Sequence, residues 1–221
     1  IYQKIEDIKV KNGINYPVNL MAVSKTFSSE DVIEAMNWGQ TLFGENRVIE
    51  AYNKFLTVKE SFANFDLHII GHLQRNKAKE AVAISSMIES IDKLDTLDAI
   101  EKEASKIGKT IDYLVEINTS YEPQKYGISP SDIYKFIEEI FKKDYKYTNI
   151  RGVMTVGPLT DDKDRIRASF RELKKIFDNL KNSLNKDDFN IISMGMSGDY
   201  EIAIEEGSNQ IRVGTLIFGR R

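Results

Sequence analysis

A lysine stands where a buried strand is predicted to open into a loop. The stretch "NLMAVSKTF" (19–27) is apolar up to Val23, and Lys25 follows it. An amine beside apolar residues is partly desolvated, which favours its neutral form, and a neutral amine can form a Schiff base with a carbonyl compound. The alternative is a solvated loop lysine, one of 31 lysines and arginines in the chain. The position of Lys25 directly after a strand, rather than on a helix face, favours the chemical interpretation.

Two later segments combine glycines with hydroxyl groups. "SMGMSGD" (193–199) ends a predicted strand and begins a helix, and "RVGT" (212–215) lies on the next predicted strand. Backbone N–H groups freed by Gly214, a helix start, and the hydroxyls of Ser197 and Thr215 together suit a phosphate group. The alternative is that these glycines only make tight turns, and the spacing alone does not decide between the two.

An arginine lies inside the last predicted strand. Arg212 stands between Ile211 and Val213, and a buried guanidinium requires an acceptor. It either pairs with Glu45 or Asp199, or donates to a ring nitrogen or a phosphate of a bound ligand.

The two histidines and the charge balance exclude several kinds of site. His68 lies in the apolar run "LHII" and is predicted to be a core or rim histidine, while His72 lacks the acidic and histidine neighbours of a metal site. The chain has no cysteine, which excludes disulfides and thiolate ligands. A net charge of −3 does not call for nucleic acid, and "LQRNKAK" (73–79) is interpreted as a local anion-steering patch. We therefore expect no metal and no nucleic-acid partner.

The elements that must position these residues alternate regularly along the 221 residues. Predicted strands cover 19–24, 41–44, 66–71, 87–91, 111–118, 150–157, 189–195 and 210–218. Predicted helices cover roughly 1–12, then 29–38, 46–56, 75–83, 93–107, 130–143, 161–184 and 199–206. Eight such units close as a (β/α)8 barrel or pack as an open doubly wound sheet, and the even spacing without a GxGxxG motif favours the α/β TIM barrel.

The organisation of the chain sets further expectations. No linker or low-complexity segment divides it, so residues 1–221 are predicted to be a single domain, with the N-terminal helix at the periphery. No apolar run reaches the length of a membrane span, and the first residues lack the apolar region of a signal peptide. The expected location is the cytoplasm, with no membrane partner.

Seven segments in order resemble one family, the pyridoxal phosphate (PLP) homeostasis proteins, single-domain relatives of the alanine racemase barrel. They are "AVSKT" (22–26), "FGENRVIEA" (43–51), "HIIGHLQRNK" (68–77), "INTSYEPQKYGI" (117–128), "IRGVMTVGP" (150–158), "SMGMSGDYEIAIEEGSNQIRVGT" (193–215) and "IFGRR" (217–221). One departure is Arg47, where members of the family often carry an aromatic residue.

The resemblance implies PLP as the cofactor and assigns roles to residues of this chain. Lys25 matches the lysine that forms the internal aldimine, and Arg212 matches the arginine that faces the pyridine nitrogen. Phosphate-binding groups match Ser197, Gly214 and Thr215. The remaining matches are pocket residues: Asn46, Met154 and Ser193.

The resemblance also favours a carrier over an enzyme. Arg212 disfavours protonation of the ring and makes it a poorer electron sink. Racemases of this fold use a second base, which the resemblance places in an additional C-terminal domain, and the chain is expected to lack that domain. We therefore expect no catalytic residues and a role in PLP homeostasis, by storage, buffering or delivery to PLP-dependent apo-enzymes, as a monomer or weak dimer. The alternatives are a weak racemase of the alanine racemase type and, from the residues alone, a Schiff-base aldolase.

Overall fold

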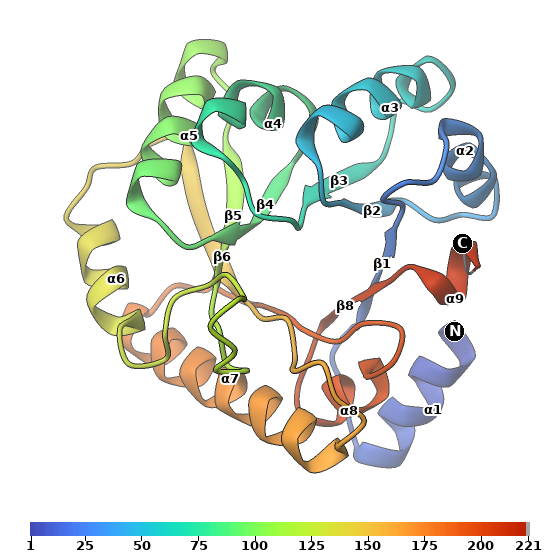
Figure 1. Cartoon of the computed structure of the whole chain (residues 1–221), viewed down its shortest axis with the longest axis vertical. Coiled ribbons are helices and arrows are strands. Elements are labelled where there is room, and N and C mark those ends of the chain that lie inside the picture. Colours follow the sequence, from blue (N-terminus) through green and yellow to red (C-terminus); the bar gives the residue numbers. More distant parts are fainter. Residues whose placement is uncertain (220–221) are drawn as a thin grey trace.

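The strands form a closed barrel. The structure is a computed structural model that describes residues 1–219, and within that range eight parallel strands pair in chain order from β1 to β8, with β8 returning to β1. Helices surround the strands (Figure 1). This arrangement confirms the predicted (β/α)8 barrel over the open sheet, because an open sheet has two edge strands, whereas here each of the eight strands pairs on both sides.

The elements agree closely with the sequence pattern. The strands are β1 (Asn19–Val23), β2 (Leu42–Glu45), β3 (Asp66–Ile69), β4 (Met87–Ile91), β5 (Ile111–Glu116), β6 (Thr148–Met154), β7 (Ile191–Ser193) and β8 (Gln210–Val213). The helices are α1 (Tyr2–Asn12), α2 (Ser29–Asn37), α3 (Val48–Ser61), α4 (Ala78–Ile84), α5 (Leu94–Ile107), α6 (Ile133–Phe141), α7 (Lys163–Leu184), α8 (Tyr200–Glu205) and α9 (Thr215–Phe218), with a 3-10 turn, η1, at Arg75–Lys77.

Several bounds differ from the prediction by a few residues, and the differences at β8, η1 and β7 change the type of an element or leave only a short strand. The predicted strand over 210–218 ends at Val213, and Gly214 turns the chain so that its carbonyl accepts hydrogen bonds from the N–H groups of Ile217 and Phe218 in α9. The predicted helix over 75–83 begins as η1 and continues as α4. The strand predicted over 189–195 is reduced to β7, Ile191–Ser193. Short apolar runs do not separate strand from helix by periodicity, which explains the first of these errors.

Most of the apolar core lies between the outer face of the barrel and the helices. Phe43 of β2 meets Phe55 of α3 edge to face, with ring centroids 5.9 Å apart, and Phe177 of α7 stacks on Phe189 before β7. Strands covered on both faces read as continuous apolar runs, as the sequence showed. The inward-facing positions carry several polar residues, and these reach the site described below.

One glycine is required by the contact between two strands. Gly152 of β6 has φ 155°, and a Cβ built on it would lie 1.9 Å from the carbonyl oxygen of Ile191 in β7. No real side chain tolerates such a distance, so the approach of β6 to β7 depends on the absence of a side chain at this position.

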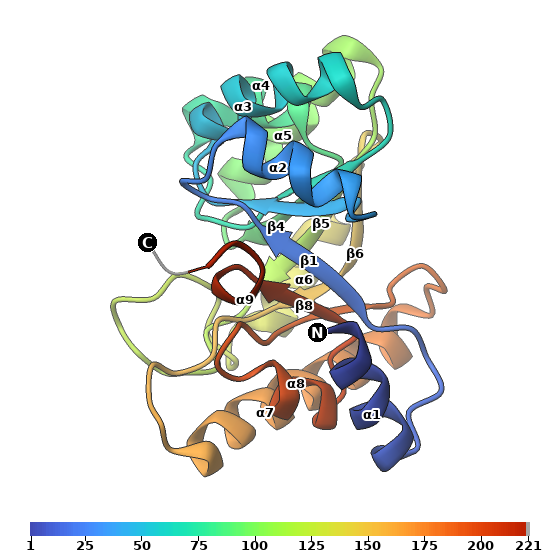
Figure 2. The same ribbon diagram turned by 90° about the vertical axis from the view of Figure 1, so that its right-hand side faces the viewer.

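The N-terminal helix packs at the periphery, as predicted. Ile5 and Ile8 of α1 are buried against Tyr200 and Ile204 of α8, and the helix ends at Gly13 in the left-handed conformation. Figure 2 shows α1 beside α8 on the outside of the barrel.

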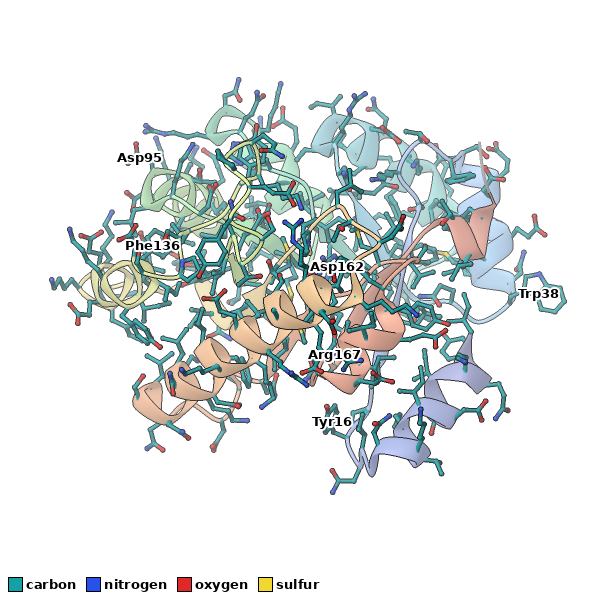
Figure 3. All side chains as sticks on the ribbon, turned by 60° about the horizontal axis from the view of Figure 1, so that its bottom comes forward. Tyr16, Trp38, Asp95, Phe136, Asp162 and Arg167 are labelled. Carbon is teal, nitrogen blue, oxygen red and sulfur yellow. The ribbon has the colours of Figure 1, made fainter. Side chains whose placement is uncertain are left out.

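Helix ends follow the capping residues in the sequence. Ser28 forms a capping box with Asp31 at the start of α2, and Asp162 accepts two backbone N–H bonds at the start of α7. Figure 3 shows Asp162 at this end of α7, and Trp38, 86% exposed, projecting outward after α2. Among residues 1–219, no helix combines the length and the apolar character needed to cross a membrane.

Candidate binding site at the carboxyl end of the barrel

Lys25 leaves the barrel directly after β1. Its side chain is exposed, so the protein's own residues do not desolvate it as the sequence had suggested. The residues on either side are held firmly: Ser24 is buried, and Thr26 has φ 65°, in the left-handed region that few β-branched residues adopt. Phe27 stacks on Phe218 of α9, with ring centroids 4.9 Å apart. The loop that carries Lys25 is therefore attached to the end of the eighth unit.

Two of the residues predicted to bind phosphate, Ser197 and Gly214, lie beside this loop. The N–H of Gly214 donates to the hydroxyl of Ser197 at 3.3 Å, which joins the loops after β7 and β8. A Cβ on Gly214 would lie 3.2 Å from the carbonyl oxygen of Val23, so the strand that precedes Lys25 runs against this glycine. Helix α9 starts at Thr215, and the first N–H groups of a helix have no partner within the helix.

Arg212 lies inside the barrel at 4% exposure. Its Nη1 donates to the hydroxyl of Ser193 at 2.7 Å, and its Nη2 donates to the carbonyl oxygen of Thr155 at 2.7 Å. Burial lowers the pKa of the Arg212 guanidinium, whereas Glu89, Glu116 and Asp199 raise it. The expected alternative of an Arg212–Glu45 pair is wrong, because Glu45 faces α3 and binds Lys54; Asp199 acts on Arg212 through its charge.

A buried carboxylate organises the barrel interior beneath Arg212. Glu89 of β4 lies 2.6 Å from Nδ1 of His68, accepts the Ser193 hydroxyl at 2.6 Å, and accepts the Gln210 amide at 2.7 Å. Burial raises the pKa of Glu89, but the hydrogen bond from His68 and the charges of His68 and Arg212 outweigh it and hold the pKa below its ordinary value. The prediction of a satisfied core histidine at His68 is thus confirmed.

The other predicted pocket residues line different parts of the barrel end. Met154 and Ser193 pair across β6 and β7, and both are fully buried. Asn46 follows β2, where a Cβ on Gly71 would lie 2.4 Å from its carbonyl oxygen. Asn46 thus follows the strand on the other side of β1 from β8, and it lines a separate hollow.

This hollow occupies about 580 Å³ beside the rim. Its lining includes Asn46, Arg47, Lys77, His72 and Tyr126. The rings of His72 and Tyr126 stack with centroids 3.9 Å apart. The exposed Arg47, where the resemblance had led us to expect an aromatic residue, adds positive charge here. Among residues 1–219, no three histidine or acidic side chains are placed to hold a metal ion.

Glu116 is a residue that the sequence analysis missed. It ends β5, is buried, and has its pKa raised to about 7 by burial and by the neighbouring charge of Asp92, with Arg212 acting in the opposite direction. A carboxyl group that titrates near neutral pH beside a buried arginine is typical of a functional site. Its only sequence signal is an acidic residue at a strand end, in "LVEIN".

The chemistry of these groups is specific. The exposed Lys25, the buried guanidinium of Arg212, and the Ser197 hydroxyl with the Gly214 N–H lie toward the carboxyl ends of β1, β8 and β7. Amines of this kind form Schiff bases with carbonyl compounds, and hydroxyl, N–H and guanidinium groups donate hydrogen bonds to phosphate oxygens and ring acceptors.

Known proteins resemble this chain over nearly its whole length. The family described as "Alanine racemase, N-terminal domain" matches residues 8–221. A protein from Aquifex aeolicus named pyridoxal phosphate homeostasis protein is 36% identical over 204 residues, which cover 91% of this chain and 86% of that protein. A protein of the same name from Helicobacter pylori is 32% identical over 216 residues, covering 97% of this chain and 93% of that protein.

A solved structure shows the same fold with a ligand. The structure of PipY from Synechococcus elongatus with PLP bound superposes with a TM-score of 0.83 at 29% identity, covering 98% of this chain and all of that chain.

Proposed function

The chain belongs to the pyridoxal phosphate homeostasis protein family, and we propose that it binds PLP and stores, buffers or delivers it without a substantial catalytic cycle. The observation that carries the proposal is the junction of β1 with β8, where the carbonyl of Val23 runs against Gly214. This close approach supports a site in which the loop that carries Lys25, after β1, lies near Ser197 and Thr215.

The residues present fit PLP group by group. The Ser197 hydroxyl, the Gly214 N–H and the start of α9 at Thr215 would hold the phosphate through donors that suit a dianion. Lys25 would supply the amine for the aldehyde. The guanidinium of Arg212 has N–H groups beyond those used by Ser193 and Thr155, and these can donate to the ring nitrogen. Asn46 and Met154 are assigned as further pocket residues.

Bound PLP supplies an aldehyde that reacts with amines and a ring that withdraws electrons. Arg212 limits the second property, because a protonated ring nitrogen would place two positive charges side by side. The network around Glu89 holds the guanidinium in place through Ser193, so Arg212 cannot easily turn away. The exposed position of Lys25 leaves the attachment point open to water and to other amines, which suits release of a cofactor more than protected chemistry.

A weak racemase of the alanine racemase type is the second candidate. The observation that favours it is Glu116, whose pKa of about 7 would let it exchange a proton near neutral pH. The comparison that separates the two candidates incubates the PLP-loaded protein with L-alanine and other amino acids in deuterated water. A carrier shows negligible exchange of the α-proton and passes PLP to an apo-enzyme.

The result that would overturn the carrier proposal is rapid α-proton exchange that is lost in Lys25→Ala. Loss of exchange in Glu116→Gln would in addition assign Glu116 as the proton carrier. The matched control is Glu138→Gln, an exposed glutamate on α6. We also propose that the protein delivers PLP to apo-enzymes, that it is located in the cytoplasm, and that it is a monomer or a weak dimer.

A further inference from the structure

A buried ion-pair network lies behind the Lys25 loop, on the outer side of the barrel. Lys54 of α3 is buried, and its Nζ lies 2.8 Å from Oε1 of Glu45 and 2.7 Å from the carbonyl oxygen of Ser24. The hydroxyl of Ser24 donates to the same Glu45 oxygen at 2.7 Å. The residue before Lys25 is thus held through its backbone and its side chain.

The same lysine reaches the residue after Lys25 through a second carboxylate. Lys54 Nζ lies 3.3 Å from Oε1 of Glu50, one turn earlier on α3. That oxygen accepts the N–H of Thr26 at 2.5 Å. Thr26 has φ 65°, a conformation that costs energy for a β-branched residue and persists only where its surroundings impose it.

The placement of these groups is difficult to explain by stability alone. A buried ion pair contributes little to stability relative to apolar residues of similar size, because desolvation offsets the attraction. Burial raises the pKa of Glu45 despite its bonds to Lys54 and Ser24, and its second oxygen, Oε2, has no hydrogen-bond partner. The network therefore costs desolvation energy, and its visible effect is the backbone shape on both sides of Lys25.

We propose that Lys54 is a positioning residue, which acts together with Glu45 and Glu50. These residues fix the backbone at Ser24 and Thr26, on either side of Lys25. The Lys25 amine is thereby directed at the carbonyl group of a ligand whose phosphate lies at Ser197 and Gly214. This inference rests on the proposed function, since it concerns the attachment of PLP at Lys25. Lys54 contacts no ligand in this scheme and acts only through the loop.

The test uses two probes to separate the placement of the Lys25 amine from the binding of the phosphate and the ring. PLP reports attachment at Lys25, measured as the rate of absorbance change and as the borohydride-fixed fraction mapped by mass spectrometry. Pyridoxine 5′-phosphate has the phosphate and the ring but no aldehyde, so it reports the rest of the site. The variants are Lys54→Met, Glu50→Ala and Glu50→Gln, and the control is Lys59→Met, an exposed lysine on the same helix.

Glu50→Ala and Lys54→Met are expected to slow attachment by about ten- to a hundredfold, the scale on which small misplacements of a reacting group act. The affinity for pyridoxine 5′-phosphate is expected to stay within about twofold, a change of under half a kcal/mol. Glu50→Gln, which keeps an acceptor for the Thr26 N–H, is expected to recover most of the rate. Lys59→Met is expected to behave as the wild type.

Unchanged attachment rates in Glu50→Ala would overturn the positioning role. An equal loss of the PLP attachment rate and of the affinity for pyridoxine 5′-phosphate would overturn it as well. Glu50 is partly exposed, so its variants decide the question even if Lys54→Met fails to fold. A wild-type protein that never attaches PLP at Lys25 would contradict the proposed function itself, together with this inference. If the wild type attaches PLP at Lys25 and the Glu50 and Lys54 variants attach it at the same rate, only the positioning role is contradicted.

Discussion

The titration of Glu116 should make the free energy of unfolding depend on pH, and Glu116→Gln should remove this dependence. Burial, together with the charge of Asp92, raises the pKa of Glu116 from an ordinary value of 4.5 to about 7. A group whose pKa is higher in the folded state stabilises the fold while it is protonated. Its contribution is therefore complete below the unfolded value of 4.5 and is lost as the pH rises through about 7.

The magnitude follows from the two pKa values. Each tenfold difference in proton affinity corresponds to about 1.4 kcal/mol, so the full contribution of Glu116 is roughly 3 kcal/mol. Most of it, about 2.5 kcal/mol, is lost between about pH 5 and about pH 8. Glu116→Gln replaces the carboxyl with a neutral amide of similar shape. The stability of this variant relative to the wild type should therefore increase by about 2.5 kcal/mol over that interval.

The assay is urea unfolding of the cofactor-free protein at several pH values. Titrating groups that do not interact with Glu116 contribute equally to both proteins, so the difference between the two unfolding free energies reports Glu116 and its charged neighbours. Glu138→Gln on α6 is the control, and its difference from the wild type should stay nearly constant. A constant difference for Glu116→Gln as well would contradict this prediction, because it would show that the pKa of Glu116 is the same in the folded and unfolded states.

Three further predictions concern the fold and the ligand. Gly152→Ala should destabilise the protein by about 3 kcal/mol or more, since its methyl group would collide with the carbonyl of Ile191, and thermal unfolding measures the loss. Ser28→Ala removes the cap of α2 and should cost roughly 1 kcal/mol in urea unfolding, without any change in PLP affinity. Ser197→Ala combined with Thr215→Val should weaken PLP retention, by roughly 1.5–3 kcal/mol for each charged hydrogen bond lost. Equal PLP affinity in that double variant and the wild type would show that the phosphate lies elsewhere.

The barrel was accessible from the sequence because its signals are local. Apolar runs alternate with amphipathic segments, and residues such as Ser28 and Gly108 mark where helices begin and end. The end of β8 was missed because a short apolar segment has too few residues to distinguish a strand from a helix. "RVGTLIF" (212–218) continues with apolar residues after Thr215, and the turn at Gly214 that starts α9 has no distinct pattern.

The site was only partly accessible, because several of its interactions join distant parts of the chain. Glu89 lies within the apolar-looking segment "MIESI", and its partner Gln210 is 121 residues away. The pairing of Lys54 with Glu45 depends on how α3 crosses β2, which no spacing rule specifies. The exposure of Lys25 likewise depends on the three-dimensional path of its loop, so the expected desolvation was wrong.

Mapping of covalent PLP on the protein decides whether the cofactor is held at Lys25. The purified protein is loaded with PLP, reduced with borohydride, digested and analysed by mass spectrometry, with Lys25→Ala treated in parallel. We expect one phosphopyridoxyl-modified peptide, which contains Lys25, and no modified peptide in the variant. A modification on another lysine, or the same labelling in Lys25→Ala, would contradict this expectation.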